Sequence, residues 1–336
     1  MLDANGQRLV NVVEIMNAIK AESPSVAEIV ERHIGLLTGV EERTRKDYRR
    51  IARDHITPHL GAFPVEALHR ERVKEWVNDL APTMSPKTLH GVYALLSSAM
   101  ETAISLRLHG DNPCRGVRLP RIRQQEMVLL TNGELGMILH HVPEHYRTFV
   151  RFLAGTGARW GEAIVLTVAD VDLLSPTATV RINKALKRAP NGHYVGEPKT
   201  IRSVRAVSLP KTLVDELVGL AVAKESGELL FTGPRGARLH HGNFRQRVWL
   251  PAIELASAED VGRLAKRPRI HDLRHSHASW LIAQGVDLPT VQRRLGHESI
   301  TTTVDRYGHL MPDQLSKAAL AADTAFTAID RGRIVI

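Results

Sequence analysis

The feature that most restricts the fold is a stretch without apolar periodicity in the first half of the chain. It covers residues 109–126 (HGDNPCRGVRLPRIRQQE) and contains two glycines, two prolines and four arginines. Glycine and proline interrupt helices and strands, so this composition indicates a linker. A chain of 336 residues is long enough for two domains of about 100–200 residues each. We therefore expect an N-terminal extension (1–23), a helical domain (24–110), an Arg-rich linker (111–126), a second domain (127–315) and a C-terminal tail (316–336).

Helix signals fill the segment before the linker. Ser25 and Glu28 have the spacing of a capping box, and the apolar residues that follow share one helix face. Ser85 followed by Pro86 marks the start of a long helix, because serine caps helices and proline suits the first helical position. Two further helical patterns lie at residues 42–60 and 69–81. These patterns predict a compact helical bundle that ends near residue 110.

The segment after the linker mixes helix signals with a few strand signals. Thr131 and Glu134 form another capping box, and helical patterns continue to about residue 167. Short runs rich in β-branched and aromatic residues then predict strands at residues 178–182, 193–199 and 203–209. We expect a turn near residue 200 to join the last two strands, and mostly helix after Pro210. The predicted fold class is therefore mainly α with a small antiparallel β-sheet, divided between two domains.

Composition excludes several classes of protein. The single cysteine, Cys114, excludes an internal disulfide and a metal site built from several cysteines. No apolar run approaches the about 20 residues that a membrane span needs, and the N-terminal residues lack the pattern of a secretory signal. We therefore expect a cytoplasmic protein without a membrane partner. The net charge of +9 and the pI of about 9.9 favour a polyanionic partner.

A glycine-rich turn stands directly before Arg159 in the sequence GTGARWGEA. Arg159 and Glu162 lie three residues apart at a predicted helix start, so both side chains can share one face. They form either an ordinary surface ion pair or an arginine that a glutamate orients into a cleft. The turn is not a phosphate-binding P-loop, since the Gly-Lys-Ser/Thr element is missing.

A histidine-rich helix is predicted at residues 269–285 (RIHDLRHSHASWLIAQG). His271 and Arg274 lie three residues apart on it, and His275 and His277 follow. The spacing of His271 and His275 occurs in helical zinc sites, but no cysteine or carboxylate lies in ligand register. We therefore favour a phosphate-binding face, on which Arg274 forms two hydrogen bonds with phosphate oxygens and His271 offers a ring nitrogen. His275 or His277 could instead cap the backbone of its own helix.

A lysine and a tyrosine supply two further candidates. Lys199 precedes a predicted turn into a strand, and Lys184 and Lys187 are alternatives for any lysine role there. Tyr307 follows His297 by ten positions in the sequence LGHESITTTVDRYGHL. A tyrosine alone says little about function, so its role depends on the rest of the chain.

Five motifs occur in the order and approximate spacing found in one protein family. They are TGARWGE, PKTIRSVRAVSLP, HDLRH, LGH and YGHL, and they cover nearly the whole second domain. In these motifs the chain resembles the tyrosine recombinases, or phage-type integrases, and its helical first domain resembles their core-DNA-binding domain. The resemblance implies six catalytic residues, of which Tyr307 is the nucleophile. They are Arg159, Lys199, His271, Arg274, His297 and Tyr307, and Glu162 supports them.

The resemblance also implies a reaction. The chain would be a site-specific DNA recombinase that cuts and rejoins DNA through a 3′-phosphotyrosyl intermediate, without cofactor or metal, and integrates or excises a phage or mobile element. His271 is our candidate for the base that deprotonates Tyr307. Lys199 would protonate the departing 5′-oxygen, and His297 would bind a phosphate oxygen. The alternatives are a chromosome-dimer-resolving recombinase, a type IB topoisomerase-like nicking-closing enzyme, a non-catalytic DNA-binding protein of the same fold, and a metal-dependent hydrolase.

The implied partners are double-stranded DNA recombination sites and other copies of the chain, in a homotetramer on two DNA sites. The tail at residues 316–336 would either pack in cis or, as the resemblance implies, dock on a neighbouring protomer. Accessory DNA-bending or directionality proteins would fit the same assembly. Basic residues of the first domain and the linker would contact the DNA backbone; the alternative is a solvated helix balanced by Asp47 and Asp54. The predicted DNA-binding residues are Arg45, Lys46, Arg49, Arg50, Arg53, Arg115, Arg118, Arg121 and Arg123.

Overall fold

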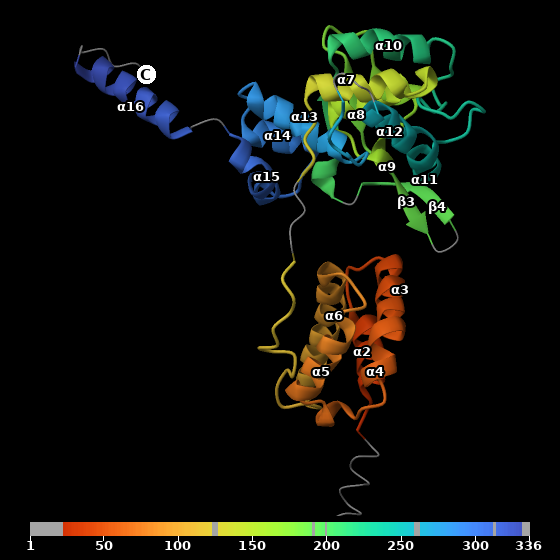
Figure 1. The fold of residues 1–336 in the computed structure, drawn as a ribbon, viewed down its shortest axis with the longest axis vertical. Helices are drawn as coiled ribbons and strands as arrows, with labels where there is room; N and C mark the ends of the chain where they lie inside the picture. Colours follow the sequence, from red (N-terminus) through yellow and green to blue (C-terminus); the bar gives the residue numbers. More distant parts are fainter. Residues whose placement is uncertain are drawn as a thin grey trace, which may run out of the picture. The chain divides into compact units, whose positions relative to one another are not determined.

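The computed structural model describes residues 23–122, 127–189, 192–198, 200–258, 263–311 and 314–330. The chain forms two compact units, Met1–Gln125 and Glu126–Ile336 (Figure 1). Each unit has its own apolar core. Two predicted site residues, Lys199 and Arg123, lie outside the described residues, as does the predicted N-terminal extension up to residue 22.

The first unit is a helical bundle around one apolar core. Its elements are α2 (Val26–Leu36), α3 (Glu42–Ile51), the π-helical turn η1 (Ala52–Ile56), α4 (Thr57–Leu60), the 3-10 turn η2 (Val65–Ala67), α5 (Arg70–Leu80) and α6 (Pro86–Ser105). α2 packs against α3, α4 and α6. The fully buried Trp76 of α5 donates its indole N–H to the His55 carbonyl at 3.0 Å. The predicted helical bundle is confirmed.

The predicted helix starts coincide with side-chain caps. Ser25 Oγ accepts from the Glu28 N–H (3.3 Å), and the Glu28 carboxylate accepts from the Ser25 N–H (2.7 Å), which completes a capping box. Ser85 Oγ accepts from the Thr88 N–H (3.2 Å), and Pro86 stands in the first turn of α6. Each cap satisfies a backbone N–H that the helix leaves without a partner, so these residues determine where the helices begin.

Part of the predicted linker packs within the first unit. Asn112 is buried, and its amide donates to the Ser97 carbonyl (3.0 Å) and to the Glu101 carboxylate (2.8 Å). Cys114 is also buried, and its N–H donates to Asn112 Oδ1 at 3.0 Å. Hydrogen bonds of Asn112 therefore help to hold this stretch in place, together with Val117 and Leu119, which pack against the core. These contacts do not follow a helical or strand period, which is the signal that a sequence pattern detects.

The second unit combines helices with two small antiparallel sheets (Figure 1). Its first half contains α7 (Asn132–His141), α8 (Glu144–Thr156), α9 (Trp160–Ala163), η3 (Val168–Asp170), β1 (Val171–Asp172), β2 (Thr179–Ile182), β3 (Ala185–Ala189), β4 (Gly192–Gly196), η4 (Ile201–Ser203) and β5 (Arg205–Ser208). Its second half contains α10 (Lys211–Ala221), α11 (His241–Phe244), η5 (Arg245–Trp249), α12 (Leu250–Ala258), α13 (Asp272–Ala283), α14 (Leu288–Leu295), α15 (Ile300–Tyr307), η6 (Gly308–Leu310) and α16 (Gln314–Asp330). The predicted fold class, mainly α with a little antiparallel β-structure, is confirmed.

The strand pairing differs from the prediction at one point. β1, β2 and β5 form one sheet in that order, with Val180 opposite Val207. β4 pairs with β3, with Lys187 opposite Tyr194. The predicted hairpin that joins β4 to β5 through a turn near residue 200 is therefore wrong. β5 joins β2 because alternate residues of both strands face the core, so Val207 extends the buried surface that Val180 begins.

Two apolar clusters of the second unit position the elements that carry the candidate site. Phe149 of α8 lies in the larger cluster, edge to face with Trp160 and Phe231 at centroid distances of 5.1 Å. The smaller cluster joins α13, α14 and α15 and contains Tyr307. Because α13 packs against both α8 and α14, the chain that follows α8 comes close to α13 and α14. In the part of the chain that the structure describes, no helix is long and apolar enough to cross a membrane.

Candidate active site

A left-handed glycine directs the chain from α8 toward the site. Gly157 has a φ of +66°, which residues with a side chain rarely adopt. A Cβ added there would lie 2.8 Å from both His277 Cδ2 and Leu295 Cδ2. Arg159 follows as the N-cap residue of α9. Backbone geometry therefore explains the glycine of the TGAR motif, and the turn presents the arginine.

The carboxylate of Glu162 joins two arginines inside the protein. It is buried and accepts from the backbone N–H and the guanidinium of Arg159, both at 2.8 Å. The Arg205 guanidinium donates two further hydrogen bonds to it, at 2.9 and 3.2 Å. Burial alone would raise the pKa of Glu162, but the bonds and charges of Arg205 and Arg159 outweigh this effect and hold the pKa at about 2. Glu162 is thus an anion at neutral pH that orients Arg159.

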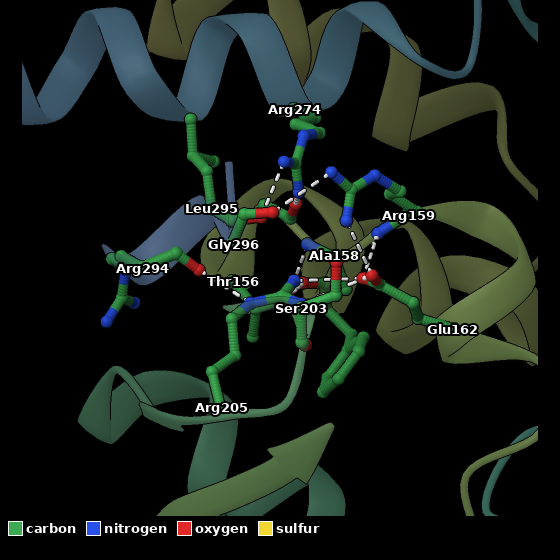
Figure 2. Close-up of polar contacts among 12 residues, drawn as sticks. Thr156, Ala158, Arg159, Glu162, Ser203, Arg205, Arg274, Arg294, Leu295 and Gly296 are labelled. Atoms are coloured by element: carbon green, nitrogen blue, oxygen red, sulfur yellow. Dashed lines mark hydrogen bonds and ion pairs between the residues drawn. The ribbon is translucent and has the colours of Figure 1, made fainter. Parts of the chain in front are cut away.

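Three arginines of the second unit meet at the C-terminal end of α14 (Figure 2). Arg205, Arg274 and Arg159 donate to three successive backbone carbonyls, those of Arg294 (2.8 Å), Leu295 (2.5 Å) and Gly296 (3.3 Å) respectively. The last carbonyls of a helix lack intrahelical partners and carry the negative end of the helix dipole. The end of α14 therefore offsets part of the positive charge that the guanidiniums bring together.

Gly296 ends α14 and permits this close approach. Its φ of +66° is left-handed, and an added Cβ would lie 3.0 Å from Arg205 Nη1 and 3.2 Å from the Arg202 carbonyl oxygen. A residue with a side chain would therefore displace the guanidinium from the helix end. The glycine of the LGH motif thus leaves room for the Arg205 guanidinium at the helix end. His297 follows it directly.

Arg274 is more deeply buried than the other two arginines. It is 2% exposed and also donates to the Gly157 carbonyl at 2.5 Å. Burial, and then the charge of Arg159, lowers its pKa to about 9, so it remains a cation at neutral pH. The side chain of Arg159 is 38% exposed. The site therefore combines one guanidinium that is held inside the protein with one that a bound anion can reach from solvent.

Tyr307 ends α15 and is completely buried. Its hydroxyl forms a 2.7 Å hydrogen bond with His275 Nδ1. Its ring lies parallel to the His297 ring at a centroid distance of 6.4 Å, and His297 Nδ1 is hydrogen-bonded to Thr303 Oγ1 at 2.9 Å. Burial raises the pKa of the Tyr307 hydroxyl, although nearby arginines oppose this shift. The tyrosine is therefore protonated at neutral pH.

The histidines around Tyr307 are neutral at neutral pH. His271 is exposed at the start of α13, but desolvation by neighbouring atoms, followed by its interactions with His275 and with the Arg274 cation, lowers its pKa to about 4. Burial likewise lowers the pKa of His275 to about 4 and the pKa of His297 to about 3. The rings of His271 and His275 meet edge to face at 4.9 Å. Among the described residues, no three His, Cys, Asp or Glu side chains are arranged to hold a metal ion.

The structure gathers most of the residues proposed from the sequence in one region of the second unit. They come from α9 and the turn before it, from α13 and its N-cap, from the turn after α14 and from the end of α15, and they are Arg159, Glu162, His271, Arg274, His297 and Tyr307. Lys199 lies outside the described residues. One alternative to it, Lys184, forms a 2.6 Å ion pair with Asp170. The other, Lys187, lies on β3 opposite Tyr194.

Two residues with direct contacts in the site escape sequence reasoning. Arg205 lies at an inward position of β5 together with Val207, and a charged residue in phase with buried valines is a signal that could identify it. His275 contacts the tyrosine, and the HDLRH motif alone does not separate its role from that of His271. The sequence offers no signal for that choice.

The basic residues predicted to bind DNA have different surroundings in the first unit. Arg45 donates to the carbonyls of Ile34 (2.8 Å) and Gly35 (2.9 Å) at the end of α2, so it stabilises the fold. Arg49 pairs with Glu31 at 2.7 Å. The more exposed members of the set are Lys46, Arg50, Arg53, Arg115, Arg118 and Arg121.

Comparisons relate the chain to known proteins. Residues 129–314 match the model of the phage integrase family. The prophage phiRv2 integrase of Mycobacterium tuberculosis is 30% identical over 277 residues, which cover 81% of this chain and 71% of that protein. The Tn1549 transposon integrase, solved with circular intermediate DNA, has a TM-score of 0.76 at 21% identity, over 89% of this chain and 100% of that one. A lambda integrase tetramer bound to a Holliday junction has a TM-score of 0.65 at 17% identity, over 92% of this chain and 82% of that one.

Proposed function

The chain belongs to the phage integrase family of tyrosine recombinases, and we propose that it breaks and rejoins DNA with Tyr307 as the nucleophile. The observation that carries this proposal is a buried tyrosine whose hydroxyl contacts a neutral histidine close to the charge of Arg274. Integrases of a prophage and a transposon among the similar proteins favour integration or excision of a mobile element. They weigh against chromosome-dimer resolution and against a topoisomerase-like activity.

Arg159 and Arg274 would hold the phosphate that is cut. A guanidinium donates two hydrogen bonds to phosphate oxygens with matching geometry. The pentacoordinate transition state carries more negative charge than the phosphodiester, so fixed cations stabilise it more than the ground state. Because Glu162 and the α14 carbonyls already fix the guanidiniums, little reorganisation is needed when DNA binds. His271 and His297 would add hydrogen bonds to phosphate oxygens.

Attack by Tyr307 would produce a 3′-phosphotyrosyl bond and a free 5′-hydroxyl. The departing 5′-oxygen needs a proton, and the family resemblance assigns that donor to Lys199. The covalent bond conserves the energy of the broken phosphodiester, so rejoining to another 5′-hydroxyl needs no cofactor. Arginines supply the positive charge in this scheme, which therefore proceeds without a metal ion.

Exposed basic side chains of the first unit would contact the DNA backbone. Arg53 pairs with Asp54 at 2.8 Å and Arg50 with Asp47 at 3.6 Å, as in a solvated helix. Exposed pairs of this kind contribute little to stability because solvent and salt screen them, so phosphates can replace the carboxylates. Such contacts position a protein on DNA and do not select the sequence. We assign this role to Lys46, Arg50, Arg53, Arg115, Arg118 and Arg121, and by extension to Arg123.

The assembly that we propose is a homotetramer on two double-stranded DNA sites in the bacterial cytoplasm. Lambda integrase, which shares the fold, has been solved as a tetramer bound to a Holliday junction. In this chain, α16 exposes Leu320 and Phe326, each 68% exposed, which suits a helix that docks on a neighbouring protomer. Accessory DNA-bending or directionality proteins would act on the same assembly.

Covalent capture tests the nucleophile. Wild type and Tyr307→Phe are incubated in EDTA with nicked suicide duplexes tiled from the DNA that flanks the gene, and the products are separated on denaturing gels. We expect a protein–DNA adduct with wild type only, because phenylalanine lacks the attacking oxygen. An adduct with both proteins would assign the nucleophile to another residue. Tight DNA binding without an adduct, even when EDTA is replaced by magnesium, would favour a non-catalytic DNA-binding protein.

A further inference from the structure

The histidine that contacts the Tyr307 hydroxyl is His275, one helical turn beyond His271. His275 is 4% exposed, and its Nδ1 lies 2.7 Å from the hydroxyl oxygen. His271, the base expected from the sequence, is exposed and meets the edge of the His275 ring. Tyr307 has no exposed surface, so solvent does not reach its proton in this conformation. In this conformation the hydroxyl is hydrogen-bonded to His275, so this ring is placed to take the proton.

The hydrogen bond between Tyr307 and His275 has a defined direction. Burial raises the pKa of the Tyr307 hydroxyl, so the phenol keeps its proton at neutral pH. Burial lowers the pKa of His275 to about 4, so the imidazole is neutral. Among the described residues the hydroxyl has no other hydrogen-bond partner, so the O–H donates to Nδ1 and the ring proton of the neutral His275 lies on Nε2. A neutral nitrogen with its lone pair directed at the nucleophile is the arrangement that general-base catalysis requires.

We propose that His275 is the general base of DNA cleavage. As the Tyr307 oxygen forms its bond to phosphorus, its proton moves to His275 Nδ1, and the bond between phosphorus and the 5′-oxygen breaks. The 5′-oxygen takes its proton from a separate acid, a position that the resemblance gives to Lys199. During rejoining, the imidazolium returns its proton to the departing tyrosine oxygen. This assignment rests on the proposed role of Tyr307 and leaves His271 to bind the phosphate.

The charges around His275 make it a stronger base once DNA is bound. The titratable and charged groups that face it are Arg269, His271, Asp272, Arg274, His297, Arg306 and Tyr307. After burial, the arginines in this set lower the basicity of the imidazole, and Asp272 opposes them. A phosphate bound by Arg274 adds a negative charge that offsets the arginines. The imidazole therefore accepts a proton more readily when the substrate is in place.

Fluorination of Tyr307 separates a general base from a purely structural partner. Fluorine atoms on the ring lower the pKa of the phenol, so the reaction needs less help to remove the proton. The full-length chain is prepared with tyrosine or difluorotyrosine at this position, in wild type, His275→Ala and His271→Ala backgrounds. The rate of adduct formation on a nicked suicide duplex is measured under single-turnover conditions, and binding to the same duplex is the control.

We expect His275→Ala to slow adduct formation by about 10²–10⁴-fold while DNA binding is retained. Difluorotyrosine should recover about tenfold or more of this loss in His275→Ala, and should give no gain in wild type or in His271→Ala. His275→Asn keeps a hydrogen-bond acceptor near the position of Nδ1 but takes up no proton. It should be as slow as His275→Ala, and it covers the case in which alanine disturbs folding.

Each other result contradicts a specific part of the assignment. Rescue confined to His271→Ala would give the role of base to His271. A wild-type rate for His275→Asn, or an absence of rescue in His275→Ala, would leave His275 as a structural partner of Tyr307. Adduct formation by Tyr307→Phe would overturn the nucleophile itself, and that outcome is independent of the rates of the histidine variants.

Discussion

Burial keeps the imidazole of His277 in its neutral form. This residue is 4% exposed, and its Nε2 accepts from Arg294 Nε at 2.9 Å. Burial, and then the charge of Arg294, lowers its pKa to about 3. In an unfolded chain a histidine has a pKa of about 6.5. The folded state therefore excludes a proton that the unfolded state takes up at mildly acidic pH.

The free energy of unfolding should fall as the pH drops below about 6.5, because only the unfolded state then gains this proton. The contribution of neutral His277 to the free energy of unfolding is fully present above that pH. It is lost as the pH falls toward the folded-state pKa of about 3, by up to about 1.4 kcal/mol per pH unit. His277→Gln keeps an acceptor for Arg294 without titrating, so its stability should depend less steeply on pH. Urea denaturation of the full chain at several pH values measures both slopes.

The matched control is His193→Gln, since His193 is exposed on the β3–β4 hairpin. Its stability should depend on pH as that of wild type does. A slope for His277→Gln equal to that of wild type would show that the folded state does not exclude this proton.

Among elements, the Arg205 side chain connects β5 to α9 and to the end of α14. It is 5% exposed, donates to Glu162, and also donates to the Arg294 carbonyl. Loss of one partner from a buried ion pair leaves an uncompensated charge and costs about 3–5 kcal/mol. β5 thus contributes to the site through the Arg205 side chain, although its backbone pairs with β2 in the three-stranded sheet.

Arg205→Met should lower the free energy of unfolding by about 3–5 kcal/mol. It should also slow adduct formation, because Glu162, which orients Arg159, then loses the two hydrogen bonds that Arg205 donates to it. Arg181→Met is the control on the neighbouring strand β2, where Arg181 faces solvent, and it should change stability by less than about 0.5 kcal/mol. Urea denaturation and the suicide-duplex assay measure the two effects. Similar losses for both variants would contradict the role of Arg205.

Helix starts are predictable from this sequence because their signals are local. Thr131 and Glu134 form the capping box that their spacing indicates, since both partners lie within one turn. β3, with the sequence ALKRA, has no alternation of β-branched residues, so its pairing with β4 escapes a pattern search.

The site is predictable only where a motif carries it. The family motifs identify Arg159, Arg274 and Tyr307, which the fold places in one region. Arg205 lies within the motif PKTIRSVRAVSLP, but its contact with Glu162 depends on the pairing of β5 with β2, which the motif does not specify. The contact of His275 with the tyrosine likewise depends on where α15 ends in space. Tertiary packing therefore sets the contacts that sequence spacing leaves open.

For the whole molecule, α16 leaves apolar side chains uncovered within a single chain. Replacing both Leu320 and Phe326 by serine should lower recombination between two sites and leave binding to one site unchanged, because the proposed cover comes from a neighbouring protomer. A plasmid recombination assay and a mobility shift on a single-site duplex measure these quantities. Asp323→Ser, on the same helix, is the control. Equal losses in the two assays would count against docking between protomers.

The turn from α14 into α15 supports both halves of the reaction. Carbonyls of the last two residues of α14 and of Gly296 accept from Arg205, Arg274 and Arg159, and the chain continues through His297 to Tyr307 at the end of α15. On the proposed function, a joint shift of α14 and α15 would displace the tyrosine and the carbonyl partners of the arginines together. We would then expect a protomer with a displaced nucleophile to hold the phosphate less firmly, which would limit strand breakage by partly assembled sites.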